Sequence, residues 1–146
     1  MEKIEISNEQ EQKLLSLFKA RKSMGLTLII IGVLGTVSGL ISIFLSSVTW
    51  VANPFLLFFI LGTIFRGQSI EAQKKIGEGA YEVYKAECKK VGWENASVDN
   101  NEVLSKKVKK PMKKIDILGS NKSMKAGDEI GILLVNKTFW VFPLSE

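Results

Sequence analysis

The sequence of 146 residues contains no histidine and only one cysteine, Cys88. The chain therefore has no imidazole metal ligand, no histidine general base and no Cys–His nucleophile pair, and it cannot form an internal disulfide. None of its glycines forms a GxxxxGK phosphate-binding loop or a GxGxxG turn. Asp128 and Glu129 are adjacent carboxylates, but they lie in a turn signal. We expect a protein that is not an enzyme and that binds neither a metal nor a cofactor.

The sequence also contains one long stretch without charged residues. From Ser23 to Phe65, 43 consecutive residues include no Asp, Glu, Lys or Arg, whereas 24% of the whole chain is charged. A bilayer core about 30 Å thick requires about 20 apolar helical residues, and the backbone inside it must form its own hydrogen bonds. Two such segments, Gly25–Leu45 and Val48–Phe65, predict a transmembrane helical hairpin over residues 23–66.

Two other interpretations fit this pattern less well. A soluble domain of this size would rarely place its buried helices in one uncharged run of such length. A secretory signal peptide would have a shorter apolar region followed by a cleavage site, whereas here a second apolar segment follows.

Basic residues flank the predicted hairpin and are absent from its turn. They precede the first span and follow the second: Lys19, Arg21, Lys22, Arg66, Lys74 and Lys75. Because Lys and Arg concentrate on cytoplasmic flanks, both termini are predicted in the cytoplasm, and Trp50 suits the opposite interface. The Asn-, Ser- and Lys-rich composition is typical of a low-GC bacterium. We expect a multi-pass protein of the bacterial cell (inner) membrane.

The first span carries small residues at helical spacing. Gly35 and Gly39 form a GxxxG motif, and Gly32 and Thr36 extend the same small surface. Such a surface lets another helix approach closely. Its partner is either the second span of the same chain or the first span of another copy, which would give a homo-oligomer.

The cytoplasmic part is predicted in two pieces, residues 1–22 and residues 67–146. The N-terminal piece has a short alternating segment, then a capping box at Ser7 and Gln10 that starts an amphipathic helix. In the C-terminal piece, apolar residues recur at helical spacing from Ser69 to Val91, which predicts one amphipathic helix.

Beyond this helix the pattern changes to β-structure. Residues 93–101 are polar and predict a linker. Apolar residues then alternate after Lys114, and Asn136-Lys137 is a plausible two-residue hairpin turn. We predict three or four antiparallel strands covered by the helix. The fold class is therefore a membrane α+β protein, with a two-helix hairpin and a small cytoplasmic domain.

A lysine cluster precedes the predicted strands. It comprises Lys106, Lys107, Lys109, Lys110, Lys113 and Lys114. The cluster either contacts anionic lipid at the membrane surface or protects a solvated edge strand from pairing with another chain. Salt-sensitive binding to anionic but not neutral vesicles would distinguish the two. A net charge of +5 is too small and too dispersed to indicate nucleic-acid binding.

These features favour a non-enzymatic membrane protein whose cytoplasmic domain binds a protein partner, as an accessory, regulatory or immunity-type subunit. The alternative is a homo-oligomeric, holin-like pore built on the GxxxG surface. Overexpression of a pore would depolarise cells, so an intact membrane potential at high expression would exclude it.

Overall fold

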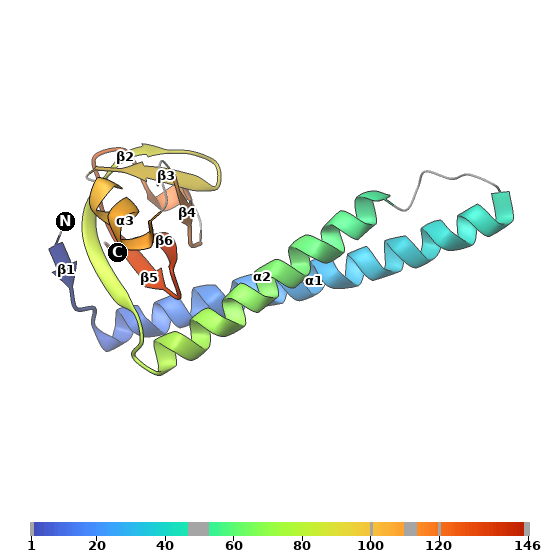
Figure 1. The fold of residues 1–146 in the computed structure, drawn as a ribbon, viewed down its shortest axis with the longest axis horizontal. Coiled ribbons are helices and arrows are strands. Elements are labelled where there is room, and N and C mark those ends of the chain that lie inside the picture. Colours follow the sequence, from blue (N-terminus) through green and yellow to red (C-terminus); the bar gives the residue numbers. More distant parts are fainter. Residues whose placement is uncertain (1, 47–52, 100, 110–113, 120, 145–146) are drawn as a thin grey trace. The chain divides into compact units, whose positions relative to one another are not determined.

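The computed structural model describes residues 2–46, 53–99, 101–109, 114–119 and 121–144. The chain divides into two compact units. The hairpin unit comprises residues 18–73, and the barrel unit comprises residues 1–17 and 74–146. In Figure 1 the ribbon is coloured along the sequence, so the helices and strands of each unit can be identified in chain order.

Most of two long helices makes up the hairpin unit. They are α1 (Asn8–Ser46) and α2 (Asn53–Gly77), and both are long and apolar enough to cross a membrane. Their hydroxyl side chains bond to carbonyls one turn earlier, as when Thr36 Oγ1 donates to Gly32 O at 2.7 Å and Ser69 Oγ to Phe65 O at 2.7 Å. These polar groups are satisfied within their own helix, as an apolar environment requires.

The start of α1 lies in the barrel unit and has the predicted capping box. Ser7 N–H donates to Gln10 Oε1 at 3.1 Å, and Gln10 N–H donates to Ser7 Oγ at 3.3 Å. The short strand predicted before it is β1 (Glu2–Ile4).

Six strands form the sheet of the barrel unit. Besides β1, they are β2 (Glu82–Val91), β3 (Asn95–Val98), β4 (Ile115–Ile117), β5 (Glu129–Val135) and β6 (Thr138–Pro143). The order β2-β3-β4-β6-β5 closes on itself because β5 also pairs with β2, and β1 adds to β2 outside this ring. All pairs are antiparallel except β4 with β6. The predicted open sheet of three or four antiparallel strands is therefore wrong, and the structure has a closed five-stranded barrel.

The strand β2 makes this closure possible. Its first part, Glu82–Glu87, pairs with β5, and its last part, from Cys88 to Val91, pairs with β3. The register shifts between Cys88 and Lys90, and such an irregularity bends and twists a strand. One long bent strand can thus belong to both halves of the barrel.

The predicted helix from Ser69 to Val91 is wrong beyond Gly77. The helix α2 ends at Gly77, Gly79 adopts a left-handed φ of 71°, and β2 begins at Glu82. A broad apolar pattern fits a helix, and it fits equally well a strand that is buried on parts of both faces. Residues 82–91 form a strand because they can pair with β3 and β5.

Two further sequence predictions in this region are also wrong. The predicted linker over residues 93–101 contains β3, and the predicted lysine-rich edge strand is the helix α3 (Asn101–Val108). Leu104 and Val108 lie four residues apart on one face of α3, and Leu104 is fully buried. Burial of these two apolar side chains on one helical face favours the helix, and the lysines do not prevent it.

The barrel encloses the core, and α3 packs against it (Figure 1). The core contains side chains from every strand of the ring, from α3 and from the segment before β5: Tyr84, Cys88, Ala96, Val98, Leu104, Ile115, Ile117, Met124, Ile130, Ile132, Phe139 and Val141. The predicted hairpin turn at Asn136-Lys137 is confirmed, because Val135 pairs with Thr138 and both turn residues have positive φ.

Candidate functional site

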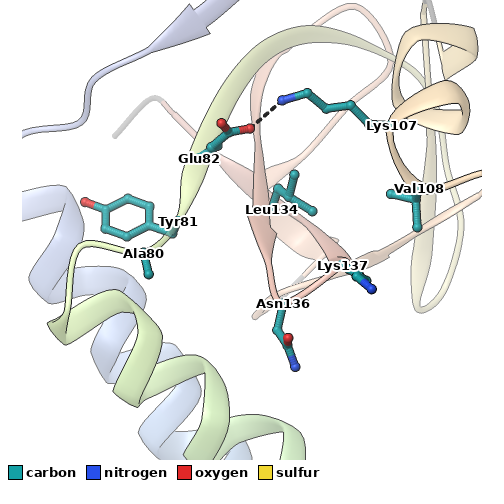
Figure 2. Close-up of a pocket in the computed structure, with 8 residues that line it drawn as sticks. All are labelled: Ala80, Tyr81, Glu82, Lys107, Val108, Leu134, Asn136 and Lys137. Atoms are coloured by element: carbon teal, nitrogen blue, oxygen red, sulfur yellow. Dashed lines mark hydrogen bonds and ion pairs between the residues drawn. The ribbon is translucent and has the colours of Figure 1, made fainter.

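A pocket of about 390 Å³ opens on the barrel unit where three segments meet (Figure 2). These segments are the start of β2, the end of α3 and the turn between β5 and β6. The lining residues are Ala80, Tyr81, Glu82, Lys107, Val108, Leu134, Asn136 and Lys137. The pocket is therefore assembled from parts of the chain that are far apart in sequence.

The pocket combines an apolar floor with a charged rim. Val108 and Leu134 are half-buried and supply aliphatic surface. Lys107 and Lys137 supply positive charge, and Glu82 supplies the opposing negative charge. Lys137 is exposed, and its left-handed φ of 64° within the tight turn fixes the direction in which its side chain leaves the backbone. Such a surface suits an aliphatic group that lies next to an acidic one.

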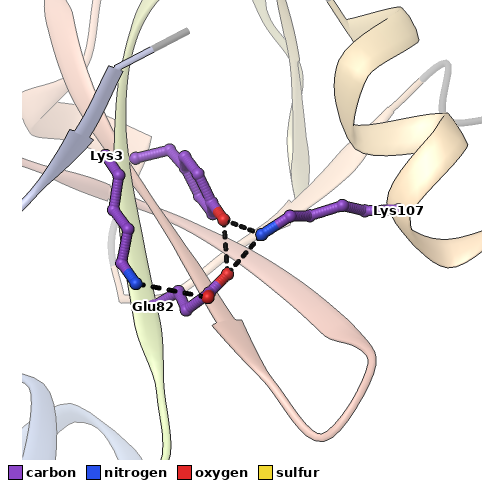
Figure 3. A network of polar contacts seen from close by, with 4 residues as sticks. Lys3, Glu82 and Lys107 are labelled. Carbon is purple, nitrogen blue, oxygen red and sulfur yellow. Dashed lines mark hydrogen bonds and ion pairs between the residues drawn. The ribbon is translucent and has the colours of Figure 1, made fainter.

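A network of polar contacts holds the rim in place (Figure 3). The Glu82 carboxylate accepts from Lys107 Nζ at 2.5 Å, from Lys3 Nζ at 3.3 Å and from the hydroxyl of Tyr84. The Lys107 ammonium also donates to the Tyr84 hydroxyl and lies 4.7 Å from the centre of that ring. The network ties β1 and α3 to β2.

This network keeps both partners charged. The hydrogen bond from Lys107, followed by that from Tyr84, lowers the pKa of Glu82 to about 2. The hydrogen bond to Glu82 raises the pKa of Lys107 in turn. A carboxylate held in its ionised form by cations is a poor general base, so the arrangement suits binding and positioning better than proton transfer.

The neighbouring tyrosine is also unsuited to proton transfer. The Tyr81 hydroxyl donates to Glu11 Oε2 at 2.6 Å, which connects the start of β2 to the first turns of α1. Burial and this acidic partner together raise the pKa of Tyr81 to about 12. The phenol therefore stays protonated at physiological pH and acts as a structural hydrogen-bond donor.

Neither Cys88 nor a metal cluster adds chemistry to the described part of the chain. Cys88 is buried in the barrel core, and burial raises the pKa of its thiol, which disfavours the reactive thiolate. No group of three or more Cys, Asp or Glu side chains that could hold a metal occurs among the described residues.

A second hollow of about 570 Å³ lies between the first turns of α1 and the end of β6. Its lining residues are Ser7, Glu9, Gln10, Lys13, Leu14, Leu17, Phe142, Pro143 and Leu144. It has one cation, Lys13, and one carboxylate, Glu9. We take the pocket at α3 as the candidate site because the hydrogen bonds and ion pairs of its charged side chains are defined residue by residue.

The structure divides the predicted lysine cluster. The four lysines of the cluster that the structure describes are all exposed: Lys106, Lys107, Lys109 and Lys114. Of these four, only Lys107 belongs to the Glu82 network. Lys110 and Lys113 lie outside the described residues. Contact of this cluster with anionic lipid remains a prediction.

Two of the small residues predicted in the first span, Gly32 and Gly35, lie at the contact between α1 and α2. A Cβ atom added at Gly32 would come within 2.6 Å of Phe59 N, and one added at Gly35 within 2.0 Å of the Phe55 ring. Gly39 is buried, and Thr36 is half-buried. Within one chain, Gly32 and Gly35 are therefore already covered by α2.

Sequence reasoning missed part of this contact. Gly25 and Gly62 face each other across the helix pair, and each would clash with the backbone of the other helix if it carried a Cβ. At the base of the spans, the Arg21 guanidinium lies 4.2 Å from the centre of the Phe65 ring. The seven-residue spacing of Gly25, Gly32 and Gly39 was the available signal.

The pocket itself had no such signal. Glu82, Tyr84 and Lys137 belong to no motif. Only closure of the barrel brings these residues together.

Comparison with known proteins gives no relative from which a site could be transferred: no family model, curated protein or solved structure matches this chain.

Proposed function

We propose that this protein is a non-enzymatic binding module anchored in the bacterial inner membrane. Its barrel unit would lie in the cytoplasm and bind a protein partner, as an accessory, regulatory or immunity-type subunit does. The observation that carries the proposal is a chain with two long helices whose apolar side chains are exposed, joined covalently to a closed barrel. The barrel has an open pocket lined by charged side chains.

The exposure of the helices supports the membrane anchor. Large apolar side chains point outward along both spans, among them Ile30, Leu34, Val37, Ile41, Leu57, Ile60 and Ile64. A core helix of a soluble protein would bury most of these side chains. A surface of this extent and character is what a lipid environment accommodates.

The pocket supports a protein partner with an acidic and aliphatic contact surface. Glu82 is already neutralised by Lys107 and Lys3, so Lys137 offers the rim's additional positive charge. The aliphatic floor next to it can accept a side chain of the partner. Charge would position the partner, and burial of the aliphatic group would supply affinity.

The proposal is tested by purification of the tagged full-length protein in mild detergent. We expect recovery of a stoichiometric partner. Lys137→Asn should weaken its binding about three- to fivefold, because a rim charge contributes up to about 1 kcal/mol. Asn tolerates the left-handed backbone at this position, so the turn should be preserved.

The matched control is Lys125→Asn, which removes an exposed lysine that does not line the pocket. It should leave binding unchanged. Equal loss in both variants would indicate a general charge effect, and the absence of any partner across several detergents and crosslinkers would contradict the proposal.

The pore alternative gains no specific support from these features. Gly32 and Gly35, which would be needed for assembly, already face α2 of the same chain.

A further inference from the structure

Trp93 is exposed to an unusual degree for its type. Its exposed fraction is 88%, and it is the sole large apolar side chain that is exposed in the described part of the barrel unit. Tryptophan has a large apolar ring system, so it is usually buried for the most part. An exposed tryptophan on an otherwise well-packed barrel suggests that another molecule contacts this side chain.

The backbone presents this side chain at a firmly held tip. Trp93 lies in the turn between β2 and β3, where Gly92 N–H donates to Asn95 O at 2.7 Å. On the other side, Glu94 O accepts from Ile117 N–H at 2.9 Å. Both neighbours of Trp93 are therefore fixed by hydrogen bonds, and its exposure does not result from a frayed chain end.

The surroundings of the tip are polar and carry charges of both signs. Lys90 and Glu94 are exposed, and Lys89 pairs with Asp99 at 2.5 Å. A protein-binding hot spot is normally surrounded by further contacts that exclude water, within an interface of about 800 Å² per partner. A single ring among charged side chains does not provide such a surface.

A lipid interface requires much less. The indole ring is favoured at headgroup depth, where its apolar body meets acyl chains and its N–H meets water. Charges of both signs beside it match the charged groups of phospholipid headgroups. Because the barrel is joined covalently to both membrane helices, the bilayer is always within reach, and one weak contact suffices.

We propose that the β2–β3 tip is a membrane-contact site, with Trp93 inserted at the headgroup level of the bilayer that α1 and α2 cross. The inference rests on the membrane anchor of the proposed function. It assigns the tip of the barrel a role in holding the barrel unit at the bilayer surface, separate from the pocket at α3.

The test is fluorescence quenching of the full-length protein in vesicles whose lipids carry bromine near the headgroup. The chain has three tryptophans: Trp50 in the predicted far turn, Trp93, and Trp140, which is buried in the barrel unit. With Trp50 and Trp93 both in lipid, Trp93→Phe should remove about half of the lipid-dependent quenching. Trp50→Phe should remove the other half of this quenching, and the double variant should show almost no lipid-dependent quenching.

The outcomes separate this inference from the anchor on which it rests. Quenching that Trp93→Phe leaves unchanged and Trp50→Phe abolishes would overturn the contact site while the anchor stands, and would leave a protein partner as the occupant of the tip. Absence of quenching in the wild-type protein would overturn the anchor itself.

Discussion

Glu82 is the residue on which three segments of the barrel unit converge. It accepts hydrogen bonds from β1 through Lys3, from α3 through Lys107, and from Tyr84 on its own strand. Its side chain remains 34% exposed, so solvent screens these interactions. Its contribution to stability is therefore that of a good surface network rather than that of a buried ion pair.

Replacement of Glu82 by Gln should lower the free energy of unfolding by about 0.5–1 kcal/mol at neutral pH. The folded pKa is about 2 against the usual 4.5, so the charged form stabilises the fold above about pH 4.5. This stabilisation should disappear as the pH falls toward 2. Thermal unfolding can be followed by the fluorescence of the buried Trp140 in a background where Trp50 and Trp93 are replaced by Phe. In that background, the protein with Glu82 and its Glu82→Gln variant should converge in acid.

Glu87→Gln is the control for this experiment. Glu87 is an exposed carboxylate on the same strand and opposes Glu129 across the ladder, so its neutralisation should cost no stability. A difference between wild-type and Glu82→Gln that does not change with pH would show that the charge of Glu82 is not the source of the effect.

At the scale of elements, the pair of α1 and α2 depends on the absence of side chains along their contact. At Gly32 the nearest atoms of the other helix are backbone atoms of Phe59 and Phe55, at 2.6 and 2.8 Å from an added Cβ. Backbone cannot rotate away as a flexible side chain can, so the helices would have to separate.

Gly32→Ala should therefore destabilise the helix pair by about 1–3 kcal/mol, the usual cost of overpacking. Gly67→Ala is a matched control on α2, because no atom lies within 4 Å of the added Cβ. It should be neutral or stabilising by up to about 1 kcal/mol, since alanine favours a helix over glycine. Unfolding in detergent measured on both variants checks the prediction, and equal behaviour would contradict the close helix contact.

The strand β2 shows why the elements were only partly predictable. Val83, Tyr84 and Cys88 fall on one helical face, but they also suit a strand that is buried on parts of both sides. Local periodicity does not decide between these possibilities. The decision depends on β3 and β5, whose hydrogen bonds to β2 join residues up to about 50 positions apart.

At the scale of the whole molecule, the flanking charges predict that both termini lie in the cytoplasm. In a Cys88→Ala background, a cysteine introduced at Lys125, which is exposed on the barrel unit, should react with a membrane-impermeant maleimide only after lysis. A cysteine at Ser47, in the predicted turn, should react in intact cells. Labelling of the Lys125 position from outside would reverse the orientation.

The sequence by itself determined the two apolar helices, the start of α1 and the β5–β6 hairpin. Each of these depends on interactions that are local along the chain: an uncharged stretch long enough for a bilayer, a capping box within one turn, and two residues that accept a left-handed backbone. The small residues of the first span also carried a local signal for close helix packing, and of the two partners that the sequence allowed, α2 of the same chain packs on Gly32 and Gly35.

The tertiary structure alone decided the closed barrel, the strand character of residues 82–91 and the pocket. Closure requires β2 to pair on both edges and β4 to lie parallel to β6, and neither pairing leaves a pattern in a single segment. For the same reason Lys3, Glu82 and Lys107 come together without a motif. These three side chains come within contact distance only after the strands and α3 have packed around one core.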